Sequence, residues 1–451
     1  MRDQLASQID RLMPRLRGDL ADLVAIPSVA DPRSHPPEDC RRAAEWVRDA
    51  FAEVGFDDAR LAETSDGSLA VLGNRPGPAG APTVLLYSHY DVMPAPDEDA
   101  WHSPPFTLTE RDGRWYGRGA ADCKGNILAQ LTALRALHAC GADLPVHLKV
   151  VCEGSEEQGT GGLEDHARRH PEDLRADAVL VCDTGNAAEG VPSVTIGLRG
   201  VTEVVVTVST LASAAHSGVF GGAAPDALAA LIQLLSTLRD AHGQTAVRGL
   251  DQDGTWPGRA YPAEQFRRDA RVLDGVDLLG GGAGVADLLW ARPALTVLGI
   301  DCPPVRGSVA AVPPRASARL SLRVPPGTDP VRAQDALVEH LRQEAPWGAR
   351  LEIERGQANA PFLAETGGPA HTALADAMRE AYGQDVSLLG AGGSIPLCTT
   401  LAELFPKAEI MLLGVEEPSC LIHAPDESVA PGELSRTALS LALFLHRFGT
   451  R

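Results

Sequence analysis

The stretch TVLLYSHYDV at residues 83–92 decides the fold, because an apolar run that ends in polar and acidic residues is typical of a buried strand. Two similar runs follow, VHLKVVCEG at 146–154 and DAVLVCDTG at 177–185, and the helix-like stretch NILAQLTALRALHA at 126–139 precedes both. Strands that alternate with helices indicate an α/β layer with a largely parallel sheet. Such sheets place their sites beyond the carboxyl ends of the strands.

From about residue 194 the pattern changes to strand, helix, strand, strand, helix and strand, which predicts a compact α+β unit of the ferredoxin-like type. After Pro361 helices and strands of the first kind return, among them AEIMLLGV at 408–415. We therefore predict one α/β domain in two parts, residues 1–193 and 359–451, interrupted by an inserted α+β domain at 194–358.

Composition narrows the class of protein. The chain has 451 residues, more than the roughly 250 to 300 at which one core stops growing, so at least two structural units are expected. The net charge of −20 opposes binding to nucleic acid or to anionic lipid. Because no run approaches the ~20 apolar residues of a membrane span and the first 20 residues are charged and helix-patterned, we expect a cytoplasmic protein.

The eight cysteines are scattered without a CxxC pair, which indicates reduced thiols rather than a disulfide framework. Cys123 and Cys182 adjoin acidic residues and are possible soft metal ligands. Cys182 precedes Asp183 at a strand end, where adjacent side chains face opposite ways, so a ligand role for Cys182 is disfavoured.

Acidic and imidazole side chains recur at the junctions between strands and loops. Burying so many carboxylates together is too costly unless cations neutralise them, and a ligand set without thiolates suits zinc, cobalt or manganese. The sequence therefore predicts a metal site from YSHYDV, GRGAADCKG, CEGSEEQGT, VCDTG and LIHAPDE, which offer His89, Asp91, Asp122, Glu156, Glu157, Asp183 and His423 as candidate ligands.

Spacing adds detail to this site. His89 and Asp91 are two residues apart on a strand and share a face, so the Asp91 carboxylate can orient the imidazole. Glu156 and Glu157 are adjacent and diverge in an extended loop. One can bind a metal while the other faces the substrate water, which is the division that a hydrolase needs.

In order and context, HYDV, GRGxxDxKG, EGxEExG, the strand-end Asp183, HSGxxGG and the late His423 resemble the aminoacylase, carboxypeptidase G and carnosinase superfamily of dinuclear metallopeptidases. The resemblance covers about residues 15 to 445. HSGVFGG at 216–222 and GGSIP at 392–396 are similar to the carnosinase-like dipeptidase branch.

The resemblance implies two divalent metal ions, most simply zinc, with manganese or cobalt as alternatives. His89 and Asp183 would bind one ion, Glu157 and His423 the other, and Asp122 would bridge them. Glu156 matches the general base that takes a proton from the metal-bound water, and Asp91 matches the residue behind His89. The peptide bond after Asp122 is expected to be cis.

The resemblance also makes the inserted domain a lid and dimerisation domain, so we expect a homodimer. His216 matches a lid histidine that donates to the tetrahedral oxyanion. Arg323 in LSLRVPP, with Gly393 and Ser394 in GGSIP, matches the residues that bind the substrate carboxylate. Two positions depart from the family pattern, since Ala214 replaces an acidic residue and Ala310 a hydroxyl residue, and both leave the substrate open.

These observations predict a metallopeptidase that cleaves the amide bond of a dipeptide or a similar small substrate with a free carboxylate. The first alternative is an N-acyl amino acid deacylase of the acetylornithine or succinyl-diaminopimelate type. A non-catalytic scaffold is disfavoured because every ligand position and Glu156 hold competent residues. A thiol-dependent hydrolase is disfavoured because no cysteine has a recognisable catalytic context.

Overall fold

The computed structural model describes residues 1–142 and 144–450, and the chain divides into two compact units. Unit 1 comprises Met1–Ile196, Ala364–Leu389 and Ile395–Arg451, and unit 2 comprises Gly197–Leu363 and Gly390–Ser394. The domain boundaries placed at 193/194 and 358/359 stay a prediction, because compact packing alone does not show that a unit folds independently.

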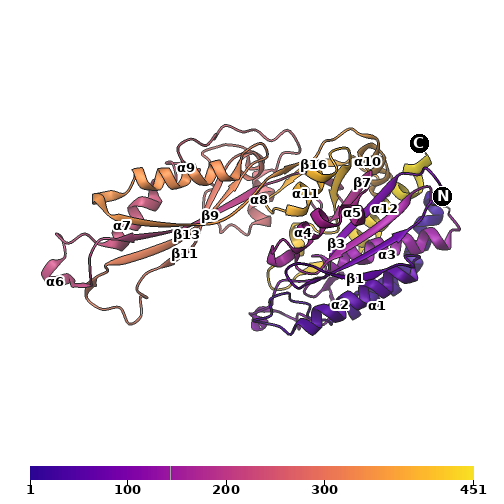
Figure 1. Ribbon diagram of the computed structural model, residues 1–451, viewed down its shortest axis with the longest axis horizontal. Coiled ribbons are helices and arrows are strands. Elements are labelled where there is room, and N and C mark those ends of the chain that lie inside the picture. The colour runs from indigo at the N-terminus through magenta and orange to yellow at the C-terminus, as the bar shows by residue number, and fades with distance from the viewer. Residues whose placement is uncertain (143, 451) are drawn as a thin grey trace. The chain divides into compact units, whose positions relative to one another are not determined.

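Unit 1 is built on a large mixed β-sheet flanked by helices (Figure 1). The strand order is β1-β2-β6-β3-β7-β17-β8, and β15 and β16 pair with β8. The central neighbours β6, β3, β7 and β17 are parallel, whereas β1, β2 and β8 join antiparallel. The mixed α/β sheet expected from the alternating pattern is therefore confirmed.

The strands of this sheet are β1 (Arg60–Glu63), β2 (Leu69–Arg75), β3 (Thr83–His89), β6 (His147–Glu153), β7 (Ala178–Cys182), β8 (Ser193–Leu198), β15 (Phe362–Leu363), β16 (Ser387–Ala391) and β17 (Glu409–Leu413). Of these, β15 and the last two residues of β8 and β16 belong to unit 2. A small antiparallel sheet joins β18 (Ser428–Val429), β5 (Arg114–Tyr116) and β4 (Thr109–Arg111).

The helices of unit 1 are α1 (Arg2–Val24), α2 (Pro37–Glu53), α3 (Lys124–Ala139), α4 (Gly162–Arg169), α5 (Pro171–Leu174), α10 (Pro369–Tyr382), α11 (Pro396–Leu404) and α12 (Pro431–Arg447). Helix α3 is buried all round from Lys124 to Leu137 because it packs against α1, α12 and β3. Its first residue follows the Asp122 loop, so this rigid helix fixes where that loop ends.

None of the helices in the described residues combines the length and the apolar character needed to cross a membrane. The expected cytoplasmic location stays a prediction.

Unit 2 contains a four-stranded antiparallel sheet in the order β11-β13-β9-β14. Helices α7 and α9 pack against it, and the apolar residues of both layers form one core. The expected order of strand, helix, strand, strand, helix and strand is confirmed by β9 (Gly200–Ser209), α7 (Ala227–Ser236), β11 (Ala294–Asp301), β13 (Arg315–Val324), α9 (Pro330–Gln343) and β14 (Arg350–Asn359).

The remaining elements of unit 2 are short. A two-stranded ladder joins β10 (Ala215–His216) to β12 (Ala311–Val312), and α6 (Ser217–Phe220) follows β10 directly. The segment between α7 and β11 contains α8 (Ala263–Asp269) and a π-helical turn (Asp287–Ala291). Tyr261 and Trp256 pack their rings against Trp290 in this segment.

Candidate metal centre

The five predicted ligands all lie in unit 1, where the structure brings them into one cluster. Three belong to the carboxyl ends of parallel strands, because His89 ends β3, Glu157 lies in the turn after β6 and Asp183 follows β7. Asp122 precedes α3, and His423 lies in the loop before β18. The peptide bond between Asp122 and Cys123 is cis, as the resemblance implies.

Asp122 lies at the centre of this cluster, and its two carboxylate oxygens face different histidines. Its Oδ1 lies 3.0 Å from His89 Nε2, and its Oδ2 lies 3.0 Å from His423 Nε2. His89 Nε2 also lies 3.0 Å from Asp183 Oδ1, and His423 Nε2 lies 3.2 Å from Glu157 Oε2. Two ligand groups therefore share Asp122 as their common member.

These separations fit two cations. Ligand atoms that bind one zinc ion at roughly 2.0 to 2.2 Å with near-tetrahedral angles lie about 3.3 Å apart, and closer at smaller angles. Asp122, Glu157 and His423 offer one such set of atoms. Glu157 Oε1 is buried without a hydrogen-bond partner in the described chain, which a bound ion would remedy. The donor set of nitrogen and oxygen atoms suits zinc, manganese or cobalt.

The pKa values of these side chains also indicate that the cluster lacks positive charge. Burial raises the pKa of Glu157 to about 7 and also raises that of Asp183. Burial opposes ionisation of Asp122, but hydrogen bonds from His423 and His89 outweigh it and lower the pKa of Asp122. Burial lowers the pKa of His423, whereas its bonds to Asp122 and Glu157 raise it to about 11. A cation would supply the charge that protons supply here.

Asp91 holds this cluster in two ways. The Nδ1 of His89 lies 3.0 Å from the backbone oxygen of Asp91 and 3.4 Å from its Oδ1. Since a carbonyl only accepts, Nδ1 carries a proton, and Nε2 is the nitrogen that would face a metal after giving up the proton it shares with Asp122. The Asp91 carboxylate accepts the backbone N–H groups of Glu156 at 3.2 Å and Glu157 at 3.0 Å. The Asp91 carboxylate, which was expected to orient the imidazole, therefore acts mainly on the loop that carries Glu156 and Glu157.

Glu156, the predicted base, lines a small pocket in unit 1 with Tyr87, Glu153 and Glu164. Burial, followed by the charge of Asp183, raises its pKa well above the ordinary glutamate value. The Tyr87 hydroxyl donates to Glu153 at 2.9 Å and satisfies one of these carboxylates. Glu156 therefore lies next to a ligand position in an environment that favours taking up a proton.

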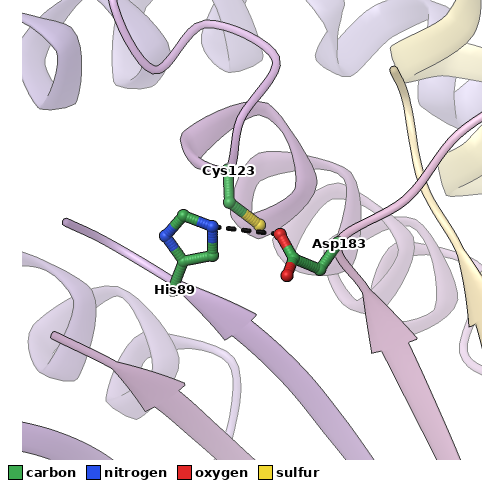
Figure 2. Close-up of side chains that lie close together, drawn as sticks. All are labelled: His89, Cys123 and Asp183. Carbon is green, nitrogen blue, oxygen red and sulfur yellow. Dashed lines mark ion pairs between the residues drawn. The ribbon is translucent and has the colours of Figure 1, made fainter. Parts of the chain in front are cut away.

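A thiol also lies in this cluster. Figure 2 shows His89, Cys123 and Asp183 facing one another, with the His89–Asp183 contact marked. The Cys123 thiol donates to the backbone oxygen of Cys182 at 3.0 Å, and burial raises its pKa well above the ordinary range. Because the thiolate is the ligand form of cysteine, this geometry favours His89 and Asp183 as the ligands.

Glu416 was not among the predicted ligands, but the structure places it with Asp122 and Asp183 in a third group of possible ligands. Its carboxylate is buried and accepts a hydrogen bond from Asn126 at 3.0 Å. Glu416 lies three residues after β17, a parallel neighbour of β7. The rule that identified the acids after β6 and β7 applies equally to β17 and would have found it.

Glu427 was not identified either, although it anchors the Asp122 loop. Its carboxylate accepts the backbone N–H groups of Gly119 at 3.0 Å and of Ala121 and Asp122 at 3.1 Å. Arg118 pairs with it at 2.8 Å, and the side chains of both residues are at most 2% exposed. One buried glutamate therefore fixes the backbone that carries Asp122.

Replacing Glu427 with glutamine is expected to weaken metal binding roughly 10- to 100-fold, the usual effect of losing an outer-shell partner. It should also cost roughly 3 to 5 kcal/mol of stability, because Arg118 keeps its buried charge without a counterion. Metal titration of stripped protein and urea unfolding measure the two effects.

Glu433 provides a matched control. It is buried, pairs with Arg436 at 2.6 Å and accepts the Gly190 N–H at 2.6 Å. Glu433→Gln should lower stability without weakening metal binding. Equal metal affinities in both variants would contradict an anchoring role for Glu427.

The four predicted substrate-binding residues belong to unit 2. His216 ends β10, and its exposed ring accepts the Gly218 N–H at Nδ1 over 3.0 Å. A neutral ring that accepts there carries its proton on Nε2, which leaves that nitrogen free to donate. Arg323 lies on β13, and Gly393 and Ser394 lie in the loop between β16 and α11.

Sequence comparison places the chain among known peptidases. The model of Peptidase family M20/M25/M40 matches residues 85–447. A cysteinylglycine-S-conjugate dipeptidase from Corynebacterium striatum is 43% identical over 440 residues, which cover 96% of each chain. A beta-Ala-His dipeptidase from Rattus norvegicus is 29% identical over 89% of this chain and 82% of its own.

Solved structures agree with this placement. Human carnosine dipeptidase 1 matches with a TM-score of 0.83 and 25% identity over 100% of this chain and 99% of its own. The di-peptidase Dug1p from Saccharomyces cerevisiae matches with a TM-score of 0.85 and 22% identity over 100% and 99%, which supports the fold. The expected resemblance to carnosinase-like metallopeptidases and the expected enzyme class are confirmed. The chain belongs to peptidase family M20/M25/M40.

Proposed function

We propose that this protein is a dinuclear metal-dependent dipeptidase that hydrolyses the amide bond of small substrates with a free carboxylate. The observation that carries the proposal is the position of Asp122, whose two oxygens lie 3.0 Å from the Nε2 atoms of two different histidines. The names of the relatives support the substrate class, since they are dipeptidases that act on cysteinylglycine conjugates and on beta-Ala-His.

We assign His89 and Asp183 to one divalent cation and Glu157 and His423 to the other, with Asp122 bridging both. Zinc fits the donor set best, and manganese and cobalt are the alternatives. When bound, the cations would polarise the scissile carbonyl and lower the pKa of water.

Within this assignment, Glu156 takes a proton from the attacking water as the carbon–oxygen bond forms. It then gives this proton to the leaving nitrogen as the carbon–nitrogen bond breaks, so one water is consumed and an acid and an amine are released. Asp91 positions Glu156 by accepting its backbone N–H. His216 donates its Nε2 proton to the oxyanion, and Arg323, Gly393 and Ser394 bind the substrate carboxylate.

We also propose a homodimer formed through unit 2. Strand β11 is an edge of the four-stranded sheet and exposes the apolar side chains of Val297, Leu298 and Ile300. An exposed apolar edge strand favours pairing with another chain. Light scattering should give a molar mass twice that of the chain, and a monomer would rule this arrangement out.

Removal of metal is expected to abolish hydrolysis of dipeptides such as Cys-Gly and beta-Ala-His, because the carboxylate cluster would lose its cations. Zinc, manganese or cobalt added to chelator-stripped protein should restore it, measured as release of free amino acid. N-acetyl amino acids are the comparison substrates. Cleavage of these alone, with any metal, would contradict the dipeptidase proposal and favour a deacylase.

A further inference from the structure

Two arginines of unit 2, Arg199 and Arg323, are near enough for the charge of one to act on the other, and neither forms an ion pair within the described part of the chain. Arg199 lies between β8 and β9, and its Nε and Nη1 atoms are buried without a hydrogen-bond partner in residues 1–142 and 144–450. Arg323 lies on β13, and the carboxylate whose charge acts on it, Glu203, is already paired with Arg319 at 2.6 Å. Both guanidinium groups therefore keep unused donors.

This arrangement is unfavourable for the protein alone. Burial and the charge of Arg323 lower the pKa of Arg199 to about 10. A buried donor on a charged group that lacks a partner is costly, and repulsion between the arginines adds to this cost. An anion placed between the two groups would remove both costs.

The loop at residues 392–394 lies beside Arg199. The Arg199 backbone N–H donates to Ala391 at 3.2 Å, which ties it to the loop that carries Ser394. A Cβ atom on Gly392 would lie 2.9 Å from Arg199 Nη2, so the guanidinium lies directly against this glycine. At Gly393 the same construction meets no atom within 4 Å. Glycine at position 392 therefore lets this loop approach the guanidinium closely.

We propose that Arg199, together with Arg323, binds the free carboxylate of the substrate beside the loop at residues 392–394. This inference rests on the proposed function and deepens it, because two guanidinium groups make a free carboxylate a requirement of the substrate. Each planar fork can donate two parallel hydrogen bonds to a carboxylate. Dipeptide amides, which lack this charge, should be poor substrates.

The test compares a dipeptide ending in glycine with the same dipeptide ending in glycinamide, using the metal-loaded enzyme. Arg199→Ala should lower kcat/KM for the acid about 10- to 100-fold, the loss expected for a hydrogen bond to a charged group. The substitution should change kcat/KM for the dipeptide amide little, so the ratio of kcat/KM for the acid to kcat/KM for the amide should fall. Arg199→Lys should restore only part of the ratio, because an ammonium lacks the fork.

Arg315→Ala is the matched control. Arg315 is exposed on the same strand as Arg323 and is paired with Glu352. This variant should keep the wild-type ratio of kcat/KM for the acid to kcat/KM for the amide. If Arg199→Ala also keeps that ratio and only lowers stability or activity on both substrates, Arg199 is structural and the inference is wrong.

A readout without turnover separates this inference from the proposed function. Free glycine should raise the melting temperature of the wild type and of Arg315→Ala, but much less that of Arg199→Ala. Protection that depends on Arg199 in a protein that cleaves no dipeptide would support the inference and refute the dipeptidase function. Dipeptide cleavage, with glycine raising the melting temperature of all three proteins equally, would support the dipeptidase function and refute the inference about Arg199.

Discussion

Replacing Glu156 with alanine is expected to lower kcat by a factor of about 10² to 10⁴ while both metal ions stay bound, the range found when general acid–base catalysis is lost. Glu156 is not needed for the ligand set, since Glu157 supplies the contact with His423 at 3.2 Å. The proton on the attacking water would then have no acceptor. Metal content by elemental analysis and steady-state kinetics on a dipeptide measure the two parts of the expectation.

Glu164 offers a control for this substitution because it lines the same pocket. Glu164→Gln should keep kcat within a few-fold of the wild type and bind metal normally. A similar loss of kcat in both variants would mean that the pocket as a whole matters. Full activity of Glu156→Ala would remove Glu156 from the mechanism, and loss of metal in that variant would make it a ligand instead.

The sheet and the cluster could be predicted from sequence for a simple physical reason. Apolar runs that end in polar residues predict buried strands, and parallel strands bring their carboxyl ends to one edge. His89 and Asp183 lie at such ends, and the structure places His89 Nε2 3.0 Å from Asp183 Oδ1. The ligand roles of Asp122 and His423 rested on their motifs, because neither residue directly follows a strand of the large sheet.

The supporting residues could not be predicted in this way. Glu427 lies 305 positions from Asp122 in the sequence, and it acts on backbone N–H groups, which leave no pattern of residue types. A role for Arg199 could not be predicted because an arginine at a strand end is usually solvated. Its burial and its missing partner depend on the packing of unit 2.

The spacing of Asp91 from His89 predicts that the two residues lie together, but not which atoms of Asp91 make the contact. Two residues of separation place Asp91 and His89 on one face of an extended chain. The strand ends at His89, however, and the backbone oxygen of Asp91 makes the closer contact with Nδ1, at 3.0 Å against 3.4 Å for Oδ1. The carboxylate is then free to bind the N–H groups of the glutamate loop.

Replacing Asp122 with asparagine is expected to have the widest effect on the metal centre. The carboxylate faces one histidine with each oxygen, so an amide would keep one acceptor oxygen and turn an NH₂ group toward the other ligand set. Its negative charge, which offsets the repulsion between two cations, would also be lost. Metal affinity should fall by more than the roughly 100-fold that an outer-shell change can cause, and hydrolysis should fall to background.

Asp177→Asn makes the same chemical change at the amino ends of the parallel strands, away from the metal centre. Asp177 accepts the Thr83 N–H there at 2.8 Å. This control should bind two ions per chain and keep its activity, whereas Asp122→Asn should retain fewer than two after dialysis. If Asp122→Asn holds two ions as tightly as the wild type, the bridging assignment is wrong. Retention of one ion would indicate that the set receiving the amide oxygen survives, and anomalous diffraction would identify it as the His89 or the His423 side.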